Sequence, residues 1–212
     1  MSYKVIRRDL TEVSRRCDFC PNYLRSLKAY VLEDSDSGEL FYAGPTCAKH
    51  KAGDDALTGI PDFTKFTKEV GEREGGGAGG GAGGSGTENS EKKAIEYIVL
   101  RESKLADELN CSYKVLRDYY EKHKAEGLSE SDVKHINNIA SKAPEHLTLT
   151  ALQRIYNYLF WIDVGIERLP EEKTDFLVGV RKTIISKGKI TDNQKSAINK
   201  WLENIAGVPQ LK

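Results

Sequence analysis

The sequence lacks any apolar run approaching the roughly 18 residues that a membrane-spanning helix needs. Its first residues, from Met1 to Arg8, also lack the apolar stretch of a secretory signal peptide. We therefore expect a cytoplasmic protein that makes no membrane contact. In a reducing compartment, cysteines spaced in pairs are better interpreted as metal ligands than as disulfide partners.

The sequence lacks an excess of charge of either sign, because 32 basic residues balance 32 acidic ones. The chain as a whole therefore does not have the strongly basic character that is typical of nucleic-acid-binding proteins. Two segments do carry a local excess: Met1–Lys28 has seven basic against three acidic residues, and Lys173–Trp201 has seven against two. The side chains that we expect to reach phosphates lie in these segments, and they are Arg7, Arg8, Arg15, Arg16, Arg25, Arg181, Lys182, Lys187 and Lys189.

Motifs of the common enzyme classes are missing as well. We find no Ser-His-Asp order, no Walker loop, no dinucleotide-binding fingerprint and no paired carboxylates that suggest acid–base chemistry. The sequence therefore predicts a non-enzymatic protein without a small-molecule substrate.

A glycine-rich tract from Gly75 to Gly86 divides the chain of 212 residues. Such a composition leaves the backbone free and offers nothing to bury, so it predicts a flexible linker. A designed tether and a natural low-complexity insert would have the same sequence pattern. The predicted organisation is a zinc-binding domain over 1–74 with a trailing helix over 62–74, the linker over 75–86, and an all-α domain over 87–212.

The part after the linker shows helical periodicity throughout, and Gly127 is the predicted end of one helix. Three further helices are predicted to begin at capping residues Ser129, Thr150 and Thr191, each followed three residues later by Asp or Gln. The segments 127–137 and 189–199 share a capping hydroxyl and an Ile-Asn pair at an offset of 62 residues. This similarity favours a duplicated helical unit, and a single helical bundle is the alternative.

The part before the linker contains two short β-type segments, Lys28–Leu32 and Glu39–Tyr42, around a turn rich in Asp, Ser and Gly. This pattern predicts a hairpin, and Gly44-Pro45-Thr46 predicts a tight turn into a short helix. The fold class is therefore a small α+β zinc-binding domain followed by an all-α domain.

Two residue pairs with the spacing of metal ligands flank this hairpin. Cys17 and Cys20 precede it, and Cys47 and His50 follow it, so the hairpin brings the pairs together. Three cysteines and one histidine make a full tetrahedral set for Zn²⁺ and leave no position for a reactive water. The predicted role of the ion is therefore structural. Buried free cysteines or a redox Cys-x-x-Cys remain as other interpretations, although a βαβ setting for the latter is missing.

The arrangement Cys-x2-Cys, hairpin, then Ala-Gly-Pro-Thr-Cys-Ala-Lys-His resembles the treble-clef or ribbon-type zinc fingers that are common in bacteriophage and mobile-element proteins. The resemblance covers Arg15 to Gly53 and implies a zinc scaffold. His50 as a ligand and Pro21 directly after Cys20 depart from the commonest pattern of such fingers.

Fingers of this kind bind nucleic acids, proteins or neither, so two functions remain open. The first is an accessory protein, of phage or bacterial origin, that binds nucleic acid or is associated with it. The second is an adaptor or inhibitor that engages a host or phage protein through the zinc finger and the helical domain. The zero net charge supports the second.

Overall fold

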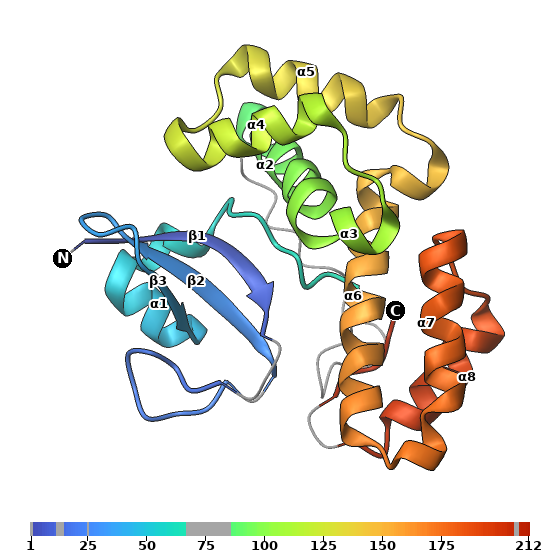
Figure 1. The fold of residues 1–212 in the computed structure, drawn as a ribbon. Helices are drawn as coiled ribbons and strands as arrows, with labels where there is room; N and C mark the ends of the chain where they lie inside the picture. The colour runs from blue at the N-terminus through green and yellow to red at the C-terminus, as the bar shows by residue number, and fades with distance from the viewer. Residues whose placement is uncertain (1, 12–14, 25, 67–85, 206–207) are drawn as a thin grey trace.

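The computed structural model describes residues 2–11, 15–24, 26–66, 86–205 and 208–212. It shows a small sheet with one helix on it, followed by an all-helical region (Figure 1). In chain order the elements are β1 (Tyr3–Leu10), β2 (Lys28–Asp34), β3 (Leu40–Ala43), α1 (Pro45–Ala52), a 3-10 turn (Asp54–Leu57), α2 (Gly86–Val99), a π-helical turn (Leu100–Lys104), α3 (Ala106–Leu109), α4 (Lys114–Glu126), α5 (Glu130–Ser141), a 3-10 turn (Glu145–Leu147), α6 (Leu149–Arg168), a 3-10 turn (Glu171–Lys173), α7 (Asp175–Lys187) and α8 (Asp192–Leu202).

The sheet has the order β1-β2-β3 and is antiparallel throughout. The predicted hairpin is β2–β3, and its turn forms because the Asp34 carboxylate accepts bonds from the backbone N–H groups of Asp36 and Ser37. Gly38 closes this turn at φ +72°, a conformation that favours glycine. The strand β1, which we did not predict, pairs with β2 along the opposite edge. We call residues 2–66 the N-terminal module.

The helical region consists of two groups of helices. In Figure 1, α2, α4 and α5 gather at the top of the view, whereas α6, α7 and α8 lie at the right. The long helix α2 packs against α4 and α5, and the long helix α6 packs against α7 and α8. The all-α character predicted for the second half of the chain is therefore confirmed for the residues that the structure describes.

The helical hairpins α4–α5 and α7–α8 have similar construction. The first helix of each is 13 residues long and ends at a glycine with positive φ, Gly127 or Gly188. The second helix of each begins with a capping box, formed by Ser129 with Asp132 and by Thr191 with Gln194. These two predicted helix starts and the predicted stop at Gly127 are confirmed.

One local prediction was wrong, and a second is contradicted in the part that the structure describes. The third helix start was expected at Thr150, but α6 begins at Leu149 and its N-cap is Thr148, whose hydroxyl accepts a bond from the N–H of Ala151. The helix expected over 62–74 is not seen in its described part, because residues 62–66 form a bridge and a turn. The rest of that helix and the linker up to residue 85 lie outside the described residues.

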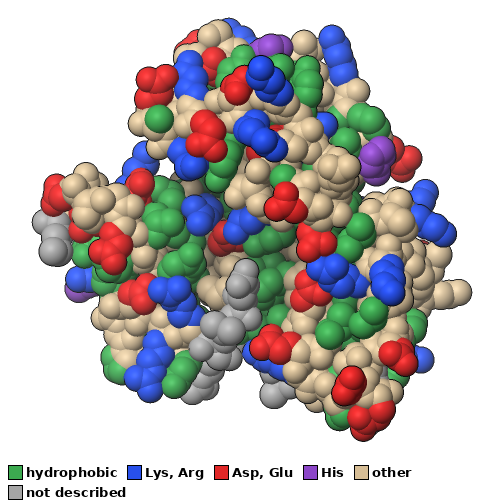
Figure 2. Space-filling model, in the orientation of Figure 1, with side chains coloured by type: hydrophobic (Ala, Val, Ile, Leu, Met, Phe, Trp, Pro, Cys, Tyr) green, Lys and Arg blue, Asp and Glu red, His purple; other side chains and the backbone are tan. Residues whose placement is uncertain are grey.

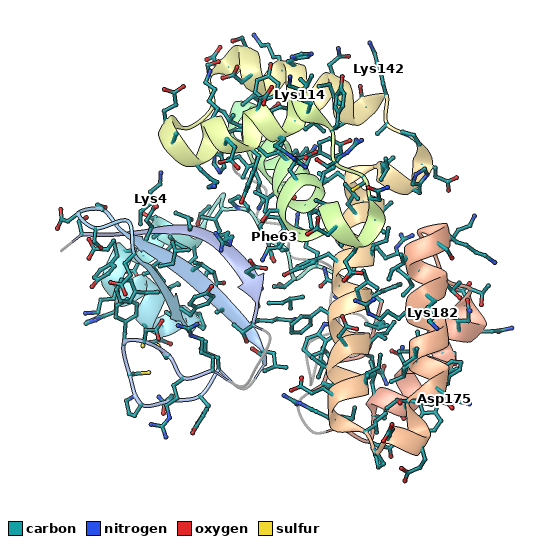
Figure 3. All side chains as sticks on the ribbon, in the orientation of Figure 1. Lys4, Phe63, Lys114, Lys142, Asp175 and Lys182 are labelled. Atoms are coloured by element: carbon teal, nitrogen blue, oxygen red, sulfur yellow. The ribbon has the colours of Figure 1, made fainter. Side chains whose placement is uncertain are left out.

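The N-terminal module packs against the helical region through apolar side chains and two buried carboxylates. Leu10, Leu27 and Phe63 belong to the same core cluster as the helical region, and Figure 3 shows Phe63 between the sheet and α6. Asp9, 2% exposed, contacts Lys104 Nζ at 2.8 Å and accepts a bond from the Tyr156 hydroxyl at 2.9 Å. The module and the helical region are therefore in direct contact.

The second buried carboxylate is Glu96 on α2, which is 1% exposed. It accepts bonds from Lys65 Nζ at 2.9 Å, from Gln153 Nε2 at 2.6 Å and from the backbone N–H of Asp62 at 3.0 Å. Two of these three donors belong to the N-terminal module. Glu96 therefore links the two parts of the chain, and both of its carboxylate oxygens accept hydrogen bonds.

Among the described residues, no helix is both long enough and apolar enough to cross a bilayer.

Candidate metal centre

The first two candidate ligands lie in a tight loop over residues 15–24, which we call the knuckle. Cys17 N–H donates to the Asn22 carbonyl at 2.9 Å, and Leu24 N–H donates to the Arg15 carbonyl at 2.7 Å. Arg16 and Tyr23 form the antiparallel bridge between these bonds. The pairing folds the chain back on itself, so that Cys17 and Cys20 lie on one short turn.

The knuckle is fixed to the edge of the sheet. Asp18 N–H donates to the Tyr42 carbonyl at 2.9 Å, and Tyr42 N–H donates to the Asp18 carboxylate at 2.6 Å. Phe19 packs edge-on against the Tyr3 ring, with centroids 5.2 Å apart, and lies 5.6 Å from the Phe41 ring. These contacts position the loop with respect to β3 and hence to α1, which follows β3 directly.

The third cysteine lies in the first turn of α1. Gly44 is the N-cap residue and Pro45 is the first helical residue, where a missing N–H costs nothing. Ala48 is fully buried against the module's core, and it holds the helix on the sheet. This packing directs Cys47 toward the knuckle.

The Sγ atoms of Cys17, Cys20 and Cys47 all lie within 4.8 Å of one another. Two sulfurs bound to one tetrahedral Zn²⁺ at about 2.3 Å would be about 3.8 Å apart. The three thiols are free rather than disulfide-bonded. The cluster could therefore hold a metal ion, and thiolates are the ligands that soft metals prefer.

The thiols differ in acidity. The Asn22 backbone N–H, followed by the Cys47 thiol, lowers the pKa of Cys20, whereas burial and then the neighbouring thiols raise the pKa of Cys47 to about 12. Neighbouring thiolates repel one another, and a cation between them offsets that repulsion. Binding of a metal ion at this cluster is therefore coupled to release of protons.

The structure brings together three of the four predicted ligands. His50 lies on α1 one turn after Cys47, and its side chain is exposed and outside the group of converging atoms. The described residues therefore show a three-cysteine cluster, with a histidine on the same helix at a spacing that places it on the same face.

The predicted phosphate contacts divide into paired and exposed side chains. Arg7 pairs with Asp9 at 3.0 Å and Arg8 with Asp62 at 3.8 Å. Arg181 pairs with Asp163 at 2.7 Å and with Glu108 at 2.8 Å, and these carboxylates raise the pKa of its guanidinium further. A phosphate that binds one of these three arginines would have to displace the carboxylates that already pair with it.

The remaining predicted cations are exposed, except Arg25, which lies outside the described residues. Arg15 and Arg16 precede Cys17 on the knuckle, whereas Lys182, Lys187 and Lys189 lie on α7 or just after it. Arg15 also pairs with Asp18 at 3.3 Å on the surface. Each of the two predicted basic segments therefore contributes exposed cations, and the two sets lie on different parts of the molecule.

Sequence reasoning missed two tyrosines, Tyr23 in the knuckle and Tyr42 beside it. The Arg15 guanidinium lies 4.0 Å from the centre of the Tyr42 ring, and the Arg16 guanidinium lies 4.9 Å from that of Tyr23. The register of the knuckle creates the second pair, because it places Arg16 opposite Tyr23. No sequence motif reveals this register.

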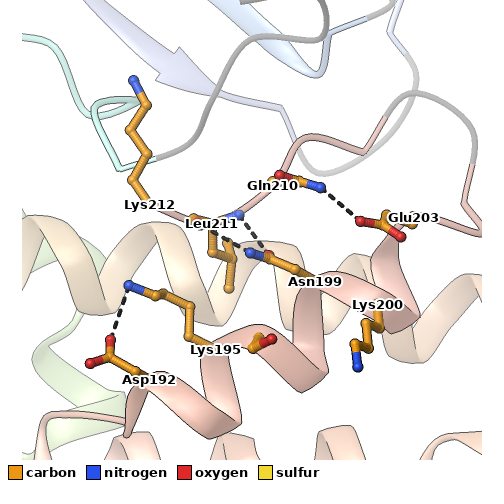
Figure 4. A pocket seen from close by; sticks show the side chains of 9 residues that line it. Asp192, Lys195, Asn199, Lys200, Glu203, Gln210, Leu211 and Lys212 are labelled. Atoms are coloured by element: carbon orange, nitrogen blue, oxygen red, sulfur yellow. Dashed lines mark hydrogen bonds and ion pairs between the residues drawn. The ribbon is translucent and has the colours of Figure 1, made fainter. Parts of the chain in front are cut away.

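A hollow of about 460 Å³ lies between α8 and residues 210–212 (Figure 4). Several of its polar groups are paired with one another: Asn199 bonds both backbone groups of Leu211, and Gln210 donates to Glu203. These side chains are therefore already engaged within the hollow.

Comparisons with protein-family models, with curated proteins and with solved structures found no match for this chain.

Proposed function

We propose that the cysteine cluster binds one structural Zn²⁺ and that His50 completes its coordination. The three sulfurs already converge, and His50 follows Cys47 by one helical turn with its side chain exposed, which supports it as the fourth ligand. A closed Cys3His set stabilises a fold and leaves no open position for catalysis.

Metal titration with Co²⁺ as a spectroscopic substitute tests this site. The intact protein should bind one Co²⁺ per chain with the intense visible bands of a tetrahedral thiolate complex. His50→Ala should weaken binding and shift these bands, whereas His50→Cys should restore tight binding. Unchanged bands in His50→Ala would show that another group, or water, is the fourth ligand.

We further propose that the protein is a non-enzymatic nucleic-acid-binding protein whose contact surface surrounds this metal centre. One observation carries the proposal: exposed cations lie beside the ligands on both of the elements that supply them. These are Arg15 and Arg16 next to Cys17, and Lys49 and Lys51 on either side of His50. A metal centre that fixes cations in this way holds them ready for phosphates at little cost in side-chain and loop entropy.

The rest of the surface favours this local mode of binding. In the face shown in Figure 2, basic and acidic side chains are intermingled and no broad field of one sign is visible. A protein with zero net charge gains little from long-range attraction to nucleic acid, so its affinity depends on a few close contacts. The exposed Lys182, Lys187 and Lys189 form the second predicted contact group.

Two double variants, measured by oligonucleotide binding over a range of salt concentrations, test the proposal. Arg15→Gln with Arg16→Gln should weaken binding to all sequences and reduce the slope of log affinity against log salt by roughly 0.7 to 0.9 per lost contact. Lys182→Gln with Lys187→Gln measures the second group separately. Zinc content is measured in each variant, because Arg16 adjoins Cys17.

A protein-binding adaptor is the second candidate function. Tyr113 is 45% exposed and Phe176 is 36% exposed on the helical region, and aromatic side chains are common at protein interfaces. If the zinc-loaded protein bound no oligonucleotide at any salt concentration, this alternative would replace the first.

We also propose that the helical region arose by duplication of a unit formed by a long helix and a helical hairpin. The matching hairpins, their equivalent capping boxes and the packing of α2 and α6 on their own hairpins support it. Ile136-Asn137 and Ile198-Asn199 occupy equivalent places, and both isoleucines are fully buried. Each unit buries only part of its apolar surface alone, so neighbouring units would stabilise each other.

A further inference from the structure

At the surface of the knuckle, the Arg16 guanidinium lies over the aromatic ring of Tyr23. Tyr23 and Arg16 are cross-strand partners, and the guanidinium lies 4.9 Å from the ring centre. Because Cys17 follows Arg16 directly, the metal centre and the backbone pairing of the loop together fix this pair. The pair is therefore preorganised.

Tyr23 is 53% exposed, the highest value among the exposed large apolar side chains that the structure describes. The neighbouring Leu24 is buried in the module's core at 7% exposure and secures the loop. The Tyr23 ring therefore contributes little to the core. A large aromatic surface left in water, on a loop whose backbone is rigidly bonded, is available to a partner.

We propose that the knuckle binds single-stranded nucleic acid by stacking one base on Tyr23 beside Arg16, while Arg15 and Arg16 contact the adjacent phosphates. This proposal rests on the proposed nucleic-acid function and names its substrate class. Single strands offer the unstacked base faces that an aromatic ring can use, and their phosphates supply the charge that complements the arginines.

The same residues argue against recognition of a duplex. In a duplex the base faces are covered by their neighbours, and only the edges in the grooves remain accessible. The nearest helix, α1, has eight residues, and its exposed basic residues Lys49, His50 and Lys51 do not form the Arg, Asn and Gln array that reads base edges. The knuckle therefore fits a strand with unpaired bases, and the stacking makes its recognition tolerant of sequence.

Fluorescence anisotropy with the zinc-loaded full chain tests this proposal, using a labelled 12-nucleotide DNA strand, the RNA strand of the same sequence and the matching DNA duplex. The single strands should bind more tightly than the duplex. Tyr23→Ala should weaken single-strand binding about 5- to 150-fold, which is the range for loss of one stacked base. Tyr23→Phe should bind like the wild type, because the ring face is retained.

Tyr113→Ala is the matched control, since it removes a similarly exposed tyrosine from the helical region and should leave binding unchanged. The stacking proposal is overturned if Tyr23→Ala binds as the wild type does while the Arg15/Arg16 double variant loses affinity; phosphate binding would then stand alone. Tighter binding of the duplex would overturn it too. Absence of any oligonucleotide binding by the wild type would refute the proposed function itself.

Discussion

The N-terminal module and the helical region are stabilised in different ways. The core cluster that belongs to the module alone is small and includes three alanines; its buried members are Val5, Cys17, Leu24, Ala29, Leu32, Ala43 and Ala48. The helical region instead buries large side chains completely, among them Trp161, Tyr97 and Ile98. Because burial of apolar area is the main source of folding free energy, the helical region can be stable by its own packing.

The module needs help from two other sources. One is the metal ion that we propose at the cysteine cluster, which would join the knuckle to α1. The other is the helical region, whose core includes the module's own Leu10, Leu27 and Phe63. A domain this small seldom folds on its core alone, and metals or partners commonly compensate. The comparison therefore predicts different responses of the two parts to the same perturbation.

Removal of the metal should have the largest effect and should act on one part only. Structural zinc contributes on the order of 10 kcal/mol to isolated finger peptides, so chelation or Cys47→Ser should unfold the knuckle and α1. Hydrogen exchange should show loss of protection in β2, β3 and α1, with α5, α7 and α8 still protected. Cys111→Ala, which removes the buried cysteine of the helical region, is the control and should keep its zinc. A metal-free protein with a fully protected module would contradict the comparison.

Loss of the Glu96 carboxylate should have the next largest effect and should act on both parts together. Glu96→Ala leaves the buried Gln153 amide and the Asp62 N–H without their acceptor, at a cost of about 2–3 kcal/mol in the free energy of unfolding. Lys65 is partly exposed, so its lost ion pair adds little. Denaturant unfolding measures the change.

Glu121→Ala is the matched control for that experiment. Its pair with Lys124 is exposed, at 3.0 Å, and should contribute less than about 1 kcal/mol. If Glu96→Ala and Glu121→Ala had equal effects, the interface between the two parts would contribute little to stability.

The features that sequence predicted are those encoded by neighbouring residues. The Cys17–Cys20 spacing, the turn at Asp34–Gly38 and the capping boxes at Ser129 and Thr191 each depend on residues less than five positions apart. In α6 the same local rule selected Thr150, because Thr148 and Thr150 both precede the apolar stripe and only tertiary packing decides between them.

What sequence could not predict depends on distant partners. The Asp9 carboxylate accepts a hydrogen bond from Tyr156, which lies 147 positions later in the sequence, and no periodicity encodes that pair. The strand β1 is mostly half-buried and its alternation is weak, so its pairing with β2 is decided by the sheet and not by its own pattern. For the candidate site, the spacing identified the three converging cysteines, whereas the pairing of Arg8 with Asp62 and of Arg181 with Asp163 depends on partners that the fold brings close.

Variants of the helix caps compare the stability of the two helical hairpins, α4–α5 and α7–α8. Ser129→Ala and Thr191→Ala each remove a side chain that accepts a bond from a backbone N–H, and each should cost about 1 kcal/mol. Equal losses in thermal or denaturant unfolding would agree with equivalent hairpins. Ser196→Ala, an exposed serine within α8, is the control and should change stability by less than about 0.5 kcal/mol. A loss confined to one cap would indicate that the two hairpins carry unequal shares of the stability.

The smallest effect should come from pH, through a histidine in the helical region. His123 lies on α4 among charged neighbours, and its Nδ1 is buried without a hydrogen-bond partner among the described residues. Burial lowers its pKa below the ordinary histidine value of 6.5, and the charges of Glu91, Lys4 and Glu33 act on it more weakly. Since the unfolded chain then binds a proton more readily than the folded one, stability is unaffected above about pH 6.5 and falls as the pH drops below that value.

His123→Gln should remove this part of the pH dependence between about pH 7 and pH 5, as measured by denaturant midpoints of variant and wild type at each pH. Protonation of the cysteine ligands also weakens the metal centre in acid, but it does so in both proteins, and the difference between them isolates the histidine. Lys4 and Glu33 belong to the N-terminal module, so protonation of His123 could also weaken the contact between the module and the helical region. Hydrogen exchange at pH 5.5 distinguishes these cases. The wild-type protein should lose protection in β1 and α4 together. Loss of protection in α4 alone would confine the effect to the helical region.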